Sequence, residues 1–190
     1  MSLLRAVAAL VMVGTVSFES AAPVASAAPG PRVTVLAVAL NNLSNLPDDP
    51  PARVQALAAA LRARLAGECG YVVVAADSLD EALGRTGRAY YYDHPDAAAK
   101  LARDAGAEWV LIPRLNRASP WVTDMQLHVV RASDGTIVSN RAVELKGFGM
   151  RDDLTEKLTA RGAAWMADQI DQAIGLSTSP GEPVTRRCRA

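Results

Sequence analysis

Three short and almost unbroken apolar runs constrain the fold of this chain more than any other feature. They are Val33 to Leu40, Tyr71 to Ala76 and Trp109 to Ile112. A strand that is apolar at nearly every position is typical of a parallel sheet buried on both faces. Parallel strands need long crossover connections, which are right-handed and usually contain a helix. The runs therefore predict an α/β domain.

The connections between these runs carry helical patterns. Apolar residues recur at helical spacing from Val54 to Leu65, with arginines on the other side. A capping box that begins at Ser78 predicts a short helix. Tyr90 to Pro95 is expected as a loop or turn, after which Asp96 caps an Ala-rich helix over Ala97 to Ala105.

The pattern changes after the third run. Polar and apolar residues alternate from Asp124 to Val129, which predicts a strand with one wet face. Ser133-Asp134-Gly135 predicts a hairpin turn, and Thr136 to Leu145 returns antiparallel. Pro113 lacks a backbone N–H, which indicates that the far end of the third run is free of ladder pairing or lies at a bulge.

A long amphipathic helix completes the domain. Its apolar stripe extends from Leu154 to Ile174, and it is expected to end at Gly175. Gly162 inside it costs about 1 kcal/mol relative to Ala unless a neighbouring backbone approaches closely there. Residues 33–175 are thus expected to form a single α/β domain with a mixed five-stranded sheet and packed helices, in the order β-α-β-(α)-α-β-β-β-α. The polar residues 176–190 are expected as a flexible tail.

The N-terminus has the pattern of an export signal. Met1 to Arg5 is a short positive region, Ala6 to Phe18 is apolar, and Ala25-Ser26-Ala27 fits the signal peptidase rule. We therefore expect residues 1–27 to be a signal peptide, residues 28–32 a leader, and the mature chain to be periplasmic or secreted. A membrane anchor is the alternative, but the apolar stretch falls short of the roughly 20 residues that span a bilayer.

Charge and missing motifs exclude several function classes. The chain has 20 Lys+Arg and 20 Asp+Glu, so it has no overall basic field to hold nucleic acid. A partner must be recognised through a local patch, with little long-range steering. No phosphate-binding glycine loop and no G-x-S-x-G motif is present. The sequence therefore predicts neither an enzyme nor a cofactor.

The chain contains two cysteines, Cys69 and Cys188. In an exported protein they can form a disulfide. Alternatively, Cys69 is a small buried apolar residue and Cys188 lies in a mobile tail. Neither cysteine belongs to a C-x-x-C motif, so redox or zinc chemistry is not expected.

Polar residues in two segments are candidates for binding a partner or an anion. Ordinary turn and capping residues, together with solvated arginines and one buried tryptophan, are the competing structural explanation. If the segments converge on one surface, that surface is the site. The candidates are Asn42, Ser44, Asp48 and Asp49 in the loop from 41 to 51, and Arg114, Asn116, Arg117 and Trp121 after the third run.

A weaker alternative is a metal site or a general base at Asp93, His94 and Asp96, where an imidazole lies between carboxylates. The competing explanation is a turn in which Asp96 caps a helix. His128 is expected to be solvated or to meet a cross-strand partner. A hydrolytic enzyme would require one of the two histidines within hydrogen-bond reach of a Ser or an Asp.

Several segments resemble a known family. They are Val35 to Ser44, Gly70 to Val74, Ala102 to Leu111, Asn116 to Ser119 and Val129 to Gly135. Together they are similar to an uncharacterised family of predicted secreted proteins, some of which are encoded beside PQQ-dependent alcohol or methanol dehydrogenases. The layout is similar in turn to the N-terminal domain of TolB and related periplasmic modules.

The resemblance implies a non-enzymatic accessory or protein-interaction domain that serves a quinoprotein dehydrogenase or another envelope component. The expected partner is a periplasmic or envelope protein, without nucleic acid and without stable membrane insertion after signal cleavage. The alternative is a periplasmic protein that binds a metal or a small ligand through Asp48, Asp49, Asp93, His94 and Asp96.

Overall fold

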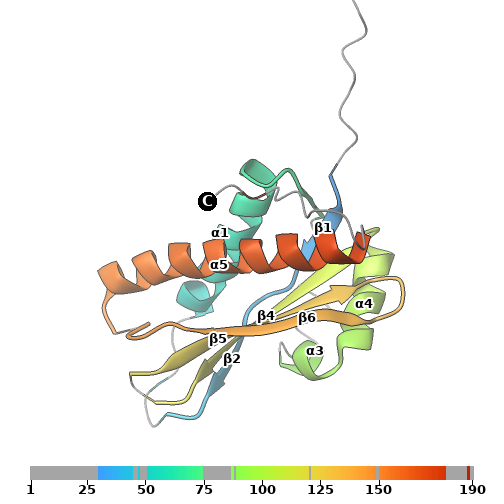
Figure 1. Ribbon diagram of the computed structural model, residues 1–190. Coiled ribbons are helices and arrows are strands. Elements are labelled where there is room, and N and C mark those ends of the chain that lie inside the picture. Colours follow the sequence, from blue (N-terminus) through green and yellow to red (C-terminus); the bar gives the residue numbers. More distant parts are fainter. Residues whose placement is uncertain are drawn as a thin grey trace, which may run out of the picture.

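The computed structural model of the chain describes residues 30–44, 47, 51–74, 87, 89–119, 121–148, 150–178 and 188. The expected signal peptide and the short helix expected after Ser78 lie outside the described residues. A mixed sheet has α1 and α5 on one face and α3 and α4 on part of the other (Figure 1). The elements are β1 Arg32–Val35, β2 Ala39–Asn42, α1 Pro51–Gly67, β3 Val72–Val73, α3 Tyr90–Asp93, α4 Pro95–Asp104, β4 Trp109–Arg117, β5 Thr123–Arg131, β6 Ile137–Glu144 and α5 Asp152–Thr178.

The sheet has the order β3-β1-β4-β5-β6, and β2 also pairs with β4. Strands β1 and β3 are parallel, and both β1 and β2 run parallel to β4. Strand β5 is antiparallel to both of its neighbours, β4 and β6. The mixed α/β sheet with packed helices that the sequence predicts is therefore confirmed.

The first apolar run forms two strands instead of one. Val35 pairs with Leu111 and Leu40 pairs with Leu115, so the first run carries one more residue than the facing part of β4. The extra residue shifts the alternation of the side chains, so that Val35 and Leu40 pack toward the same core. The sheet consequently has six strands where five were expected, because an insertion of this kind leaves no mark on a continuous apolar run.

Side chains of α1 bind the backbone at this interruption. Gln55 accepts a hydrogen bond from the Val38 N–H (3.1 Å) and donates one to the Val38 carbonyl (3.0 Å). Arg62 donates to the Val35 carbonyl (2.7 Å). Buried backbone groups need such partners, so these two polar residues allow the strand to break inside the core.

Pro113 lies opposite the interruption. In β4 it falls between Leu111, the last residue paired with β1, and Arg114, the first paired with β2. Its missing N–H therefore removes no bond to either strand. The strand end is not free of pairing, because Pro113 lies opposite Leu127 of β5, and the irregularity is in the facing run between β1 and β2. Strand β4 continues to Arg117, beyond the end at Ile112 that the apolar run indicated.

The face under α1 and α5 holds the larger core. The buried residues of α1 are those that the helical spacing predicts, and they pack with α5 against alternate residues of β4 and β5. At Gly162 of α5 an added Cβ would lie 3.2 Å from both Leu57 Cδ2 and Met125 Sδ. This close approach, made by side chains and not by a backbone, explains the glycine inside the helix.

Three segment boundaries differ from those expected from the sequence. Tyr90–Asp93 forms the one-turn helix α3 instead of a loop. Helix α4 begins at Pro95, a residue suited to the first turn, so Asp96 lies inside the helix and does not cap it. Helix α5 continues past Gly175 to Thr178.

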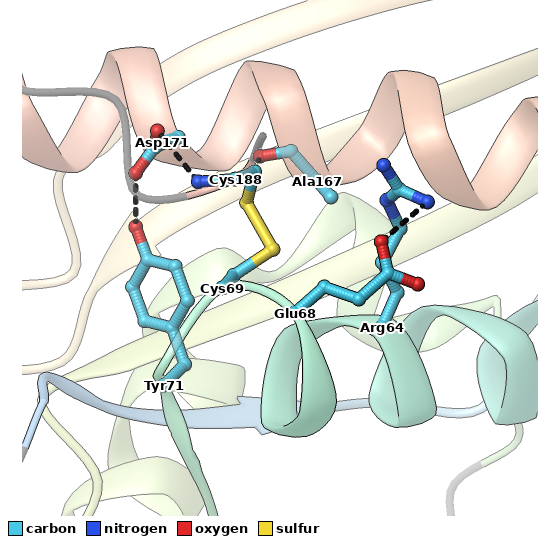
Figure 2. The surroundings of a disulfide bond; sticks show 7 residues. All are labelled: Arg64, Glu68, Cys69, Tyr71, Ala167, Asp171 and Cys188. Atoms are coloured by element: carbon cyan, nitrogen blue, oxygen red, sulfur yellow. Dashed lines mark hydrogen bonds and ion pairs between the residues drawn. A yellow bond between two sulfur atoms is a disulfide. The ribbon is translucent and has the colours of Figure 1, made fainter. Parts of the chain in front are cut away.

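A disulfide joins Cys69, just after α1, to Cys188, and Figure 2 shows its surroundings. The Cys188 N–H donates to Asp171 Oδ2 of α5 (3.2 Å), and the Tyr71 hydroxyl donates to Asp171 Oδ1 (2.9 Å). Cys188 is buried. This residue of the C-terminal segment is thus bound to the α1 and α5 side of the domain.

Candidate functional site

Part of the second sheet face has no helix over it in the described chain. Helices α3 and α4 lie under one end of the sheet, while β2 and the adjoining ends of β4 and β5 extend beyond them (Figure 1). Because Met125 and Leu127 face the larger core, Asp124 and Gln126 face the opposite way. The register places polar residues of β2, β4 and β6 beside them. We call this surface the open polar face: Asn41, Arg114, Asn116, Asp124, Gln126 and Glu144.

Arg114 is held at the edge of the open polar face nearest to α3. Its Nε and Nη2 donate to Gln126 Oε1 (3.0 and 2.8 Å). The guanidinium carbon lies 3.7 Å from the centroid of the Tyr92 ring, and Nη1 lies 3.6 Å from Asp93 Oδ1. These contacts fix the guanidinium group and join α3 to the sheet.

His128 lies beneath this arrangement and is 6% exposed, so the strand face on which it lies is not wet there. Its ring stacks on Tyr92 with 4.0 Å between centroids, and no hydrogen-bond partner reaches Nδ1. Burial, and then the charge of Arg114, lower the pKa of His128; Asp93, Asn140 and the Tyr92 backbone oppose the shift. Burial also raises the pKa of Tyr92. Both side chains are therefore favoured in their neutral forms.

The loop after β2 meets the end of β4. Asn41 Nδ2 donates to Asn116 Oδ1 (2.9 Å), and an Arg117 guanidinium N–H donates to the Pro47 carbonyl (3.4 Å). Asn42 Oδ1 accepts bonds from the backbone N–H (3.1 Å) and the hydroxyl (2.6 Å) of Ser44, which makes a local turn. Asn42 and Arg117 are cross-strand partners on the opposite side of the sheet from Arg114 and Asn116, so the structure does not place all of the candidates on one surface. Asp48 and Asp49 lie outside the described residues.

Two large apolar side chains are exposed next to this junction. Leu43 and Trp121 are each 66% exposed, while Arg117 is 4% exposed. The backbone beneath them is fixed, because the Leu43 N–H donates to the Arg117 carbonyl (2.9 Å) and the Gly147 N–H donates to the Trp121 carbonyl (3.2 Å). The competing explanation predicts solvated arginines and one buried tryptophan. Here Arg117 is buried and Trp121 is exposed, so that explanation does not hold for these two residues. We call Leu43 and Trp121 the exposed corner.

The residues of the metal alternative have separate surroundings. Asp93 lies near Arg114, as described above. The His94 ring stacks on Tyr90, with Nδ1 2.9 Å from the Tyr90 carbonyl oxygen. Asp96 lies in the first turn of α4. Among the described residues, no three His, Cys, Asp or Glu side chains are grouped so as to hold a metal ion.

A shallow cleft of about 240 Å³ lies between α1 and α5, lined by Arg53, Ala56, Thr155, Glu156 and Thr159. Its threonine hydroxyls donate to carbonyls of their own helix. Both threonine hydroxyl donors are therefore used within the helix, and we assign no binding role to this cleft.

Sequence reasoning missed Tyr92, Asp124, Gln126 and Glu144. The alternation of β5 places Asp124 and Gln126 on the face opposite Met125, so this signal could have identified two of them. Tyr92 and Glu144 belong to the arrangement only through packing and register.

A family model, DUF3280, described as "Protein of unknown function (DUF2380)", matches residues 31–170. None of the curated proteins matches the chain significantly. The similar solved structures include the LpoB C-terminal domain from Salmonella enterica: 18% identity, 63% of this chain and 85% of that chain covered, TM-score 0.44. TolB from Acinetobacter baumannii is 11% identical, with 76% and 28% covered and a TM-score of 0.47. Lipoprotein GNA1162 from Neisseria meningitidis is 17% identical, with 73% and 98% covered and a TM-score of 0.46.

Proposed function

The chain belongs to the DUF3280 family, whose function is unknown, and from its own surface we propose that it is an exported, non-catalytic accessory domain that binds a periplasmic or envelope protein. The exposed corner is the contact surface in this proposal. It is flanked by the residues that the sequence suggests for binding a partner.

The observation that carries the proposal is the exposure of Leu43 and Trp121, each of which has a backbone hydrogen bond to a neighbouring segment, at Arg117 and Gly147 respectively. Single exposed apolar residues are common on soluble proteins. Here two large ones lie next to the same strand end, and tryptophan is enriched among the residues that dominate protein contacts. A fixed backbone lowers the entropy lost on binding, which favours recognition at this position.

Two features support an oxidising compartment. The N-terminal residues have the pattern of a signal peptide. The chain also has the Cys69–Cys188 disulfide, and disulfides persist in exported proteins. No described helix is both long and apolar enough to cross a membrane.

The surroundings of the histidines support a role without catalysis. His128 is stacked under Tyr92, and the His94 ring nitrogen is close to a backbone carbonyl. Within the described ranges, no hydrogen bond joins either ring to a Ser, Thr or Cys side chain, as an activated nucleophile would require. The most specific partner that the family resemblance suggests is a PQQ-dependent alcohol or methanol dehydrogenase.

Site-specific photo-crosslinking tests the proposal. A photoreactive phenylalanine derivative replaces Trp121 in the full chain, which is expressed with its own N-terminal segment in the organism from which the sequence comes. The matched control carries the same group at Val72, an exposed residue of β3 at the opposite edge of the sheet from β6. We expect position 121 to crosslink to one periplasmic or envelope protein and position 72 not to do so. Identical crosslinking patterns from both positions, or none from 121, would contradict the proposal.

A further inference from the structure

Strand β6 forms one edge of the sheet. It pairs with β5 from Ile137 to Glu144, and no other described strand pairs with its outer side. Five of its eight residues are exposed, and the remaining three are partly buried. An edge of this length is a template for another strand, because its outer backbone groups lack ladder partners.

The register shows which backbone groups point outward. The Leu145 N–H donates to the Thr123 carbonyl (2.7 Å), and Glu144 is the next residue, directly opposite Asp124. In an antiparallel pair, hydrogen-bonded and non-bonded positions alternate along the strand. The N–H and C=O groups of Asn140, Ala142 and Glu144 therefore point away from β5.

We propose that the β6 edge binds an extended segment of a partner protein, which adds to the sheet as an antiparallel strand. This segment carries a basic residue opposite Glu144 and, three positions further along, an acidic residue opposite Arg141. The inference goes beyond the proposed function, because it concerns a different surface from the exposed corner and stands without it.

The charges on β6 select this partner. Glu144 lies directly opposite Asp124 on the open polar face, and like charges at such a position are unfavourable. Glu144 also has a long ion pair with the exposed Lys146, whose Nζ is 3.8 Å from Glu144 Oε1. A basic side chain of an added strand would lie beside Glu144 on the same face and offset this repulsion. Arg141 points to the other face, opposite Leu127, where an acidic side chain would be its complement.

Charge also distinguishes a partner strand from a second copy of this chain. If two β6 edges paired around a two-fold axis, the outward groups would have to face one another. Consider the registers whose two-fold axis passes between residues 140 and 144. In each of them, two Arg141 side chains or two Glu144 side chains lie directly opposite or diagonal to each other. Like charges at these positions oppose pairing, which favours a strand of different sequence.

A short peptide tests the proposal on the intact mature chain. The probe is Thr-Lys-Val-Thr-Glu-Thr, which places Lys opposite Glu144, Val opposite Val143 and Glu opposite Arg141. The control peptide exchanges Lys and Glu. Amide hydrogen exchange and chemical shifts are followed by NMR during each titration. We expect the probe to slow exchange of the outward amides of residues 140, 142 and 144, and to bind about two- to fivefold more tightly than the control.

Two variants make the test independent of unfolding. Ala142→Pro removes an outward N–H that the sheet of this chain does not use, so it should retain the fold and lose the peptide. Exchanging the charges, Arg141→Glu with Glu144→Lys, should reverse the preference between the two peptides. Equal binding of both peptides to the native chain would overturn the proposal. So would dimerisation through β6 without peptide, or unchanged binding by Ala142→Pro.

Discussion

The two faces of the sheet are built from the same strands but differ in what covers them. Under α1 and α5, alternate residues of β4 and β5 form a continuous apolar core, and the disulfide lies on that side. On the other face, α3 and α4 cover only a smaller cluster, and the open polar face continues beyond them. Most of the buried apolar side chains therefore lie on the face under α1 and α5, while polar side chains that are partly or fully exposed remain on the other face.

A variant that removes a side chain from the larger core should lose the most unfolding free energy. Leu61 of α1 is fully buried, so Leu61→Ala should lower the free energy of unfolding by about 2–5 kcal/mol. Glu144→Gln on the open polar face should change it by less than about 0.5 kcal/mol. Urea denaturation of both variants measures the difference. Similar losses would mean that the two faces share the stability equally.

Overfilling the same core should have a smaller effect. In Gly162→Val the new side chain meets Leu57 and Met125, so we expect a loss of about 1–3 kcal/mol. Ala160→Val, at an exposed position of α5, is the control and tests helix propensity alone. Thermal unfolding compares the two variants. Equal melting temperatures would show that α5 can move away from β5 without cost.

The weakest effect concerns His128 and depends on pH. Its pKa in the folded state is lowered from 6.5 chiefly by burial, so the unfolded chain binds more protons as the pH falls through about 6.5. Stability contributed by the neutral ring is therefore present above that pH and is lost on acidification toward the lowered pKa. His128→Phe keeps a ring against Tyr92 but does not titrate. We expect this variant to lose less unfolding free energy than the native chain between pH 8 and pH 5, as measured by urea denaturation. An equal dependence of the unfolding free energy on pH in both chains would contradict the role given to His128.

Much of the fold can be predicted from local pattern. The resemblance to an uncharacterised family is confirmed by the family match over residues 31–170. The buried positions of α1 follow directly from 3.6-residue spacing. The β5 alternation likewise predicts that Met125, Leu127 and Val129 face the core.

The site is less predictable, because it depends on which elements become neighbours. The polar character of Arg114, Asn116 and Arg117 is visible in the sequence. Their different environments are not, since Arg117 is buried and Arg114 lies over Tyr92. The metal alternative is inferred from residues that are close in the sequence. In the structure, Asp93, His94 and Asp96 contact different neighbours.

The sequence by itself determines the alternation of apolar and polar residues, and with it the strands, the amphipathic helices and the N-terminal export pattern. Periodicity acts within one element, so it is present before the chain folds. Only the tertiary structure decides the interruption between β1 and β2, the pairing of Cys69 with Cys188, and the directions of the outer groups of β6. Each of these depends on register or contact between residues far apart in the chain, which no local pattern specifies.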